Sequence, residues 1–405
     1  MRFLHTSDWH LGRMLYAQNR WREFEAFLDW LLHTIEEQQV ELLIVAGDVF
    51  DTATPASRVL NMYYDFLYRV SLGCCTNVVV VGGNHDSPSV LNAPAHVLKV
   101  LNVHVVGEMT GDPEEELIIL RDRQGHAEAI VCAVPFLRDR DVRSVQVGDE
   151  VSSRQEQLIR GIVGHYRLVA EKAEELRRAA GRAIPVIATG HLFTQSERSE
   201  EFEGEGVRDL YVGSLAYVDA SLFPPTFDYV ALGHIHRSQR VGGRDTLRYS
   251  GSPLPMGFRE ALYAKKVIIA DTQDNRVLPR ELEVPVFQSL LRLEGDFAGI
   301  SERILQLKAG GSTAWLEIEL TSDELKPQLT EEIQELLAGS GLQALKIKNR
   351  NFAAHALQTG SEIRSLDDLT EEEVFENCMN DHKVAEEERE ELRRAFREIL
   401  QQLVL

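Results

Sequence analysis

The chain has 405 residues and a formal net charge of −21 at pH 7. Its length is enough for two or three domains with cores of their own. The lack of any apolar run of about 18 residues argues against a transmembrane helix. The acidic excess disfavours a protein that binds a polyanion on its own surface alone. A small substrate, a partner that supplies binding surface, or basic residues that cluster only in the fold remain as alternatives.

The N-terminus and the cysteines indicate a cytoplasmic protein. Phe3 and Leu4 open the chain, and neither the basic region nor the small-residue cleavage site of a signal peptide is present. The four cysteines include no Cys-x-x-Cys pair, which argues against a zinc ribbon or a disulfide framework. We therefore expect a cytoplasmic location without membrane contact.

Strands and helices are predicted to alternate over the first hundred residues. Short apolar runs predict strands, and apolar residues at helical spacing, such as Phe24, Phe27 and Leu31, predict helices. The predicted strands are 1–6, 42–46, 78–81 and 103–106, and the predicted helices are 21–37, 56–70 and 89–100. This alternation is typical of an α/β fold with right-handed crossovers.

The pattern continues and closes a first predicted domain, 1–283. Its remaining predicted elements are strands 117–120, 129–133, 186–189 and 229–232, helix 154–180, and antiparallel-looking strands 239–241, 247–250 and 265–270. After the short linker Val284-Pro285-Val286, a smaller α/β domain is predicted over 287–349. Its predicted elements are strands 287–293, 315–320 and 345–348 and helices 301–307 and 330–337.

Residues 366–405 are predicted to form two short amphipathic helices. Thr370 and Glu373 make a capping box, and apolar stripes follow in each half of the segment. Such helices have little core of their own. Either they pack on the main domain or they dock a partner helix in a groove.

Five loops that follow predicted buried strands carry acid, amide or imidazole groups. They are Asp8-Trp9-His10, Gly47-Asp48-Val49-Phe50-Asp51, Gly83-Asn84-His85-Asp86, Gly190-His191 and Gly233-His234-Ile235-His236. In open α/β sheets, ligands gather at the carboxyl ends of the strands. Five of the chain's 13 histidines lie in these loops. Structural roles alone do not explain so many histidines at strand ends, so we predict a metal site.

The donor types narrow the choice of metal. Carboxylate, imidazole and amide oxygen suit manganese, iron, zinc or magnesium rather than copper(I). Seven ligands are too many for one ion. If Asp48 bridges, two ions about 3.5–4 Å apart can be held, an arrangement used for in-line displacement at phosphorus.

The order of these motifs resembles the calcineurin-like metallophosphoesterase superfamily. The resembling stretches are Leu4–Gly12, Val45–Thr52, Gly83–Ser87, Ala188–His191, Ala231–Arg237 and Tyr249–Pro253. The Asp-Trp-His form, the Ser-Pro strand end and the appended small domain are similar to its DNA-nuclease branch. The resemblance covers the whole chain. It implies an α/β fold: a metallophosphoesterase β-sandwich flanked by helices, a smaller capping domain over 287–349 and a C-terminal helical tail over 366–405.

The resemblance also implies ligand sets. Asp8, His10, Asp48 and His236 would hold one ion, and Asp48, Asn84, His191 and His234 the other. His85 would be the catalytic imidazole, next to a ligand but not one itself, and would protonate the leaving oxygen. The ions implied are Mn²⁺, with Mg²⁺ or Fe²⁺ as alternatives.

Asp51 would be an eighth, surplus ligand. Phosphatases of the superfamily place an aspartate here to orient the catalytic imidazole, whereas archaeal nucleases of the branch have a histidine. We therefore predict that the Asp51 carboxylate holds one nitrogen of His85. The alternative is that Asp51 caps the following turn with Thr52.

The implied function is exonuclease action on double-stranded ends and endonuclease action on hairpin or single-stranded DNA, in DNA repair, recombination and replication. The implied partner is an SMC-like ATPase that would bind the tail helices and supply basic surface. Helices 56–70 and 89–100 resemble the family's dimer-forming bundle, within a heterotetramer, or are ordinary sheet-covering helices. Arg13, Asn19 and Arg20 are candidates for phosphate contacts, with solvated surface as the alternative.

Two other functions use the same residues. A small-substrate phosphatase or cyclic-nucleotide phosphodiesterase would need the metals but neither the tail nor the capping domain. A scaffold without metal would have no need of the complete ligand set.

Overall fold

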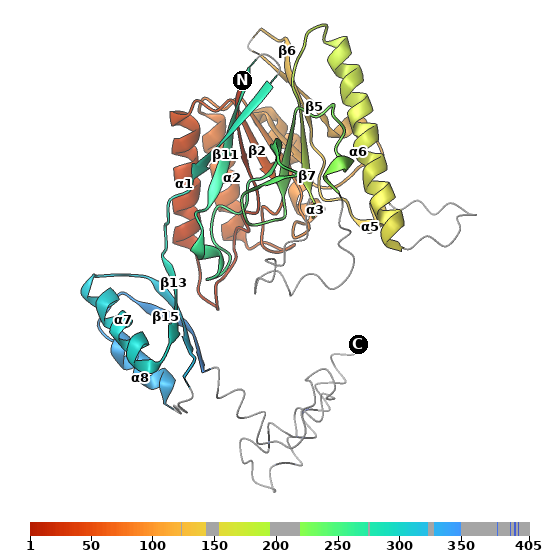
Figure 1. Cartoon of the computed structure of the whole chain (residues 1–405). Helices are drawn as coiled ribbons and strands as arrows, with labels where there is room; N and C mark the ends of the chain where they lie inside the picture. Colours follow the sequence, from red (N-terminus) through yellow and green to blue (C-terminus); the bar gives the residue numbers. More distant parts are fainter. Residues whose placement is uncertain are drawn as a thin grey trace.

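The computed structural model describes residues 1–122, 124–142, 154–194, 219–273, 276–322 and 328–349, together with Met379, Arg389, Arg393 and Phe396. Apart from these four positions, the predicted tail over 366–405 lies outside the described residues. The described chain forms a large two-sheet unit and a smaller unit (Figure 1). None of the described helices combines the length and the apolar character needed to cross a membrane.

The first sheet has six strands in the order β12-β11-β1-β2-β3-β4. β1 to β4 pair in parallel, and β11 and β12 extend the sheet antiparallel beyond β1. The strands are β1 (Arg2–Thr6), β2 (Leu42–Ala46), β3 (Asn77–Val81), β4 (Val103–Val106), β11 (Lys266–Gln273) and β12 (Arg276–Glu283). The carboxyl ends of the parallel strands therefore share one edge of the sheet.

The second sheet also has six strands, in the order β5-β6-β7-β8-β10-β9. Its central strands pair in parallel, and β5 and β9 pair antiparallel at the two edges. The strands are β5 (Leu117–Arg121), β6 (Ala127–Cys132), β7 (Val186–His191), β8 (Tyr229–Gly233), β9 (Gln239–Val241) and β10 (Arg244–Tyr249).

The two sheets pack face to face, with helices on their outer faces (Figure 1). Ile44 and Val79 of the first sheet share one core with Val131 and Ala231 of the second. Two helices cover the outer face of the first sheet and one covers that of the second. These helices are α1 (Trp21–Glu37), α2 (Ser57–Ser71) and α6 (Arg154–Ala179). Because both of its faces are covered, β2 is an unbroken apolar run in which every residue is buried.

Short helical segments connect these layers. They are α3 (Pro88–Asn92), α4 (Ala95–Leu98), η1 (Lys99–Leu101), η2 (Pro113–Glu116), α5 (Asp139–Val142), η5 (Ala220–Leu222) and η6 (Glu260–Leu262).

The smaller unit is a parallel three-stranded sheet with two helices packed on one face. Its elements are β13 (Leu290–Gly295), α7 (Phe297–Ala309), β14 (Trp315–Leu320), α8 (Leu329–Leu337) and β15 (Gln343–Asn349). Leu290 and Trp315 pack with Leu15 and Phe258 of the large unit in a separate apolar cluster. The small sheet thus touches the loop that follows the first metal motif.

The α/β class is confirmed, but the structure differs from the predicted elements in three places. The helix predicted over 89–100 is broken into α3, α4 and η1, because Pro94 has no N–H to continue the first helix. β12 was not predicted; it contains Pro279, which is tolerated there because β12 is an edge strand. β10 pairs in parallel with β8, and β11 leaves for the first sheet, so the region is not an antiparallel set.

Candidate metal centre

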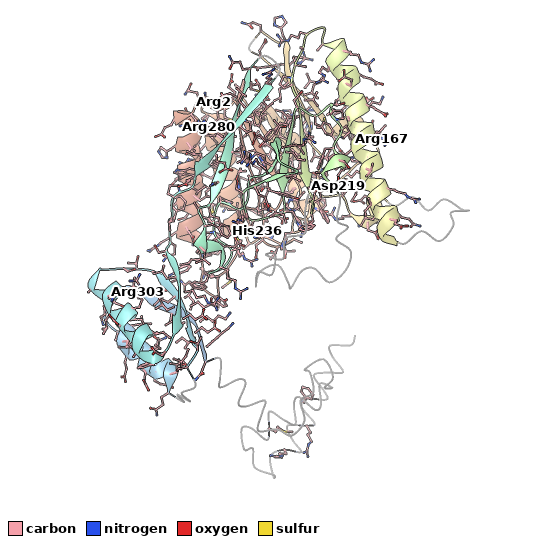
Figure 2. All side chains as sticks on the ribbon, in the orientation of Figure 1. Arg2, Arg167, Asp219, His236, Arg280 and Arg303 are labelled. Carbon is pink, nitrogen blue, oxygen red and sulfur yellow. The ribbon has the colours of Figure 1, made fainter. Side chains whose placement is uncertain are left out.

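The five predicted loops converge at one end of the sandwich. Main-chain hydrogen bonds join the first two loops: Asp8 N donates to Gly47 O at 3.0 Å and His10 N to Asp48 O at 3.0 Å. The Asp8 carboxylate reaches the second sheet, where its Oδ1 accepts from His234 N at 2.8 Å. Figure 2 shows the labelled His236 at the end of the large unit that lies toward the small one.

Four candidate ligands have strained backbone conformations. Asp8, His10, Asp48 and His234 have positive φ values of 53°, 46°, 51° and 99°. A left-handed conformation costs a non-glycine residue about 1–2 kcal/mol. Such strain persists only where the surroundings over-determine it, and it clusters at functional sites.

Glycine is required where these loops approach one another. A Cβ on Gly83 would collide with the Asp48 carboxylate, and one on Gly233 would collide with the main-chain oxygen of Ala46. The missing side chains allow loops of β2, β3 and β8 to lie in direct contact.

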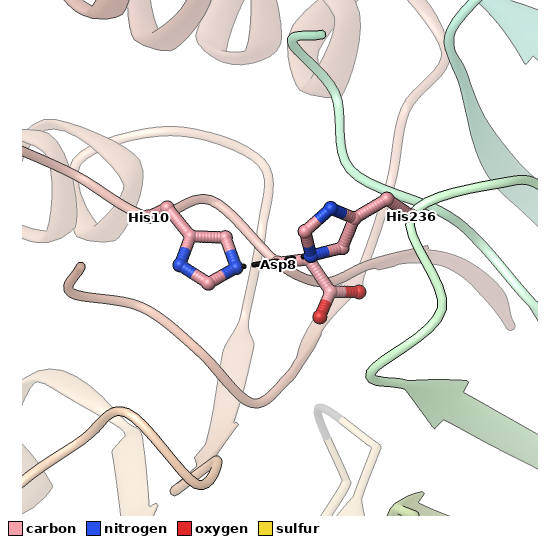
Figure 3. Close-up of side chains that lie close together, drawn as sticks. All are labelled: Asp8, His10 and His236. Atoms are coloured by element: carbon pink, nitrogen blue, oxygen red, sulfur yellow. Dashed lines mark hydrogen bonds between the residues drawn. The ribbon is translucent and has the colours of Figure 1, made fainter. Parts of the chain in front are cut away.

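The first donor cluster contains Asp8, His10 and His236. Figure 3 shows the two imidazoles with their Nε2 atoms facing each other, 3.2 Å apart. The Nδ1 atom of His236 lies 3.0 Å from Glu260 Oε1, and that of His10 lies 3.5 Å from Asp51 Oδ1. Because a carboxylate only accepts, the His236 Nδ1 atom is protonated. The Nε2 atoms of both rings face a common position beside the Asp8 carboxylate, which suits a cation.

The second donor cluster contains Asp48, Asn84, His191 and His234. Asn84 Oδ1 lies 3.0 Å from His191 Nε2 and 3.0 Å from His234 Nδ1. His191 Nε2 also lies 3.2 Å from Asp48 Oδ2. Neighbouring donors of an octahedral ion with bonds of about 2.1 Å lie about 3.0 Å apart. The donors therefore have both the chemistry and the spacing of a divalent-metal site.

Asp48 connects the two clusters. Its Oδ2 atom lies 3.6 Å from His10 Nε2 and 3.2 Å from His191 Nε2. Burial opposes the charge of Asp48, but His191 and His10 hold the pKa of the carboxyl well below its usual value. Burial also opposes charge on His191, but Asp48 raises the pKa of that imidazole to about 9. A ligand imidazole must be neutral, so His191 would have to lose a proton in order to hold a metal ion.

Asp51 is not placed as predicted. The His85 ring is held by the main-chain oxygen of Asp51, 2.9 Å from its Nδ1, while the Asp51 carboxylate contacts Arg13 at 3.1 Å and faces His10. The prediction that this carboxylate orients His85 was wrong in its geometry. The His85 main-chain N–H donates to Asp48 Oδ1 at 2.9 Å, which places the imidazole beside the donor clusters.

Of the three candidates for phosphate contacts, Arg20 is neither such a contact nor the solvated surface given as the alternative. Its side chain is buried in a bidentate pair with Glu23, with both contacts at 2.8 Å, and it donates to Pro255 O at 2.9 Å. Arg13 is half-buried and is paired with Asp51.

Two acidic residues at the site escaped the sequence reasoning as functional groups. The Asp86 carboxylate accepts main-chain N–H groups of Val49, Phe50 and Gly83, and so joins two of the metal loops. Glu260 lies behind His236. Asp86 stands within one of the five motifs, so the sequence did mark its position. Glu260 lies 24 residues from its partner His236, and the only signal near it was the preceding Ser-Pro strand end.

Comparison with known proteins gives the class. The calcineurin-like phosphoesterase family matches residues 1–238, more than half of the chain, and the type 5 capsule protein repressor C-terminal domain family matches residues 286–383. The chain therefore belongs to the calcineurin-like phosphoesterases, a family of metal-dependent hydrolases. The predicted enzyme class is confirmed.

Within this family, the chain falls in the branch of SbcD, the nuclease component of the SbcCD complex. The chain is 36% identical to the SbcD subunit of the nuclease SbcCD from Escherichia coli (strain K12) over 98% of this chain and 97% of that protein. It is 38% identical to the Rhodobacter capsulatus protein of the same name (72% of this chain, 71% of that protein), and 31% identical to the Bacillus subtilis one (83% and 82%). The predicted function as an SbcD-type nuclease is confirmed.

Proposed function

We propose that the chain is a two-metal phosphodiesterase that acts on DNA, as an exonuclease on double-stranded ends and an endonuclease on hairpin or single-stranded DNA. The observation that carries this proposal is the pair of donor clusters joined by Asp48. Asp8, His10 and His236 of the first cluster, together with Asp48, would hold the first ion. Asn84, His191 and His234, together with the same Asp48, would hold the second ion.

The donor set favours manganese, with magnesium or iron as alternatives, because it combines carboxylates, imidazoles and an amide oxygen. Two bound ions activate a water molecule and neutralise the phosphate oxygens as charge develops. The protein's own contribution is to hold seven donors on strand ends before the substrate arrives.

His85 would supply the proton that the leaving deoxyribose oxygen needs. Its Nδ1 must donate to the Asp51 carbonyl, which can only accept. That contact leaves Nε2 as the nitrogen that gives and takes the catalytic proton. The T-shaped contact with His10, with ring centroids 4.8 Å apart, places His85 beside the first cluster.

The separation of ligand and catalytic roles can be tested directly. We expect His85→Ala to keep both manganese ions and to lose most DNA cleavage, by about 10²–10⁴-fold, as for loss of a general acid. Cleavage of blunt and hairpin DNA with Mn²⁺ and bound metal would be measured together. Equal loss of metal and activity in His85→Ala would contradict the assignment. If the unmutated chain cleaved aryl phosphodiesters but not DNA, a small-substrate phosphatase would be favoured instead.

Access and partners follow from the remaining parts of the chain. The small unit at 290–349, which packs on Leu15 and Phe258, would act as a capping domain that shapes access to the centre. Relatives are named as subunits of SbcCD. We therefore propose that the SMC-like ATPase SbcC binds the segment 366–405 in the cytoplasm and supplies the basic surface that a chain of charge −21 needs.

A homodimer within that complex is supported by an apolar surface. Tyr68 and Leu72, at the end of α2, are 53% and 70% exposed, and Val97 and Val100, at α4 and η1, are 69% and 83% exposed. We propose that these four side chains gather into one apolar patch, which is typical of an interface. Val100→Glu is expected to yield monomers in sedimentation, with Leu305→Glu on α7 as the control; an unchanged dimer would exclude this surface.

A further inference from the structure

The two candidate ions differ in what stands behind their histidines. Behind the first cluster, the outer nitrogens of His10 and His236 face carboxylates, those of Asp51 and Glu260. Behind the second, His191 Nδ1 donates to the uncharged main-chain oxygen of Ala46 at 2.9 Å. A carboxylate behind an imidazole fixes its tautomer and makes it a more basic ligand than a carbonyl does.

Glu260 is the more tightly built of the two carboxylates. Its Oε1 accepts from His236 Nδ1 at 3.0 Å, and its Oε2 accepts from Met256 N at 3.2 Å and from Lys265 Nζ at 2.5 Å. The side chains of Glu260 and Lys265 are 15% and 7% exposed. A buried carboxylate with partners on both oxygens has little freedom to turn, so it fixes the plane of the His236 ring.

Lys265 ties the same unit to the main chain of the ligand. Its ammonium group donates to His236 O at 3.0 Å and to Ser252 Oγ at 2.9 Å, besides Glu260. The lysine therefore neutralises Glu260 and holds the ligand's backbone at once. His236 is thus held at both ends, through Glu260 at the ring and Lys265 at the carbonyl.

We propose that Glu260, supported by Lys265, is a positioning residue that sets the occupancy of the first ion by holding His236 with its Nε2 lone pair toward the donor cluster. This proposal rests on the proposed ligand role of His236. The first ion would then depend on a buried carboxylate–ammonium unit behind His236, whereas the His191 ligand of the second ion is held by a main-chain oxygen.

The test is manganese binding to the full-length chain. Binding would be measured by calorimetric titration and by the electron paramagnetic resonance signal of the coupled ion pair. We expect Glu260→Gln to weaken one of the two ions by about 10–100-fold and to leave the other unchanged. The coupled signal should give way to that of a single ion. Glu283→Gln, at an exposed glutamate on β12, is the control and should bind as the wild type does.

Glu260→Gln also leaves Lys265 buried without its counter-ion, so a fold defect must be told apart from a ligand defect. The charge-balanced variant Glu260→Gln with Lys265→Met removes both charges together. We expect it to recover the thermal stability of the metal-free protein but not the first-ion affinity. A double variant that binds both ions with wild-type affinity would overturn the role of Glu260. A wild-type chain that binds no manganese pair would instead overturn the proposed function.

Discussion

Arg20 and Glu23 form a buried ion pair at the start of α1 whose removal tests a structural role against a DNA-binding role. Their side chains are 0% and 4% exposed, and the two charged groups meet through two contacts of 2.8 Å. Arg20 also donates to Pro255 O at 2.9 Å, which links α1 to the segment that leads to Glu260. We predict that neither side chain contacts DNA.

The expected magnitude follows from burial. Arg20→Met or Glu23→Leu leaves one charge buried without its partner, which costs about 3–5 kcal/mol. The double variant removes both charges and should cost far less, because a buried pair replaced by apolar side chains is often neutral. Each single variant should lower the melting temperature of the large unit by about 6–10 °C, and the double variant should recover most of that loss.

The measurement is differential scanning calorimetry of the four proteins in the double-mutant cycle, compared by transition temperature because the chain has more than one unit. DNA affinity at two salt concentrations is measured beside it. If Arg20→Met left the transition unchanged and flattened the salt dependence of DNA binding, Arg20 would be a phosphate contact and the reasoning from burial would be refuted.

Three further predictions concern single residues. Gly83→Ala should weaken manganese binding by at least about tenfold in titration, because its methyl group collides with Asp48; Gly164→Ala, with open space around the added Cβ, is the control. Asp51→Asn should leave the alkaline limb of the pH–rate profile unchanged, because the main-chain oxygen holds the His85 ring, which must be protonated to act as the proposed acid; a shifted limb would restore the carboxylate's role. Burial lowers the pKa of His5 to about 3 from 6.5, so the unfolded chain gains a proton below pH 6.5 that the folded chain does not. The free energy of unfolding should therefore decrease as the pH is lowered, by about 2 kcal/mol at pH 5 from this residue. Urea unfolding should show that His5→Gln lacks this decrease of about 2 kcal/mol.

The sequence carried the layers of the fold because their signals are local. The predictions 42–46 and 21–37 coincide with β2 and α1, since a doubly covered strand is continuously apolar and a covering helix has an apolar stripe. Pro94 and Pro279 mark where local patterns misled. One breaks a helix whose apolar spacing looked continuous, and the other lies in an edge strand whose pairing only the tertiary structure provides.

The candidate site was predictable to the extent that strand ends carry its groups. All seven predicted ligands fall in the two donor clusters, and Asp48 of the second cluster also approaches His10 of the first. Asp51 misled because its main-chain oxygen, rather than its side chain, meets His85, and main-chain contacts leave no residue pattern. The contact of Glu260 with His236 could not be predicted, because the two residues lie in different loops and no fixed sequence spacing links them.

The bridge at Asp48 depends on how the two sheets pack. Gly47 and Asp48 follow β2 with φ of 90° and 51°, so the chain turns in two consecutive left-handed residues. A side chain on Gly47 would collide with the ring of His191, and that ring donates from Nδ1 to Ala46 O at 2.9 Å across the sandwich. His191 is therefore seated by the backbone of the strand whose aspartate it approaches. A shift between the sheets would separate Asp48 from His191 while leaving it near His10. The first donor cluster spans the two sheets as well, because His10 follows β1 and faces His236, which follows β8. The sheet-to-sheet core therefore maintains both clusters.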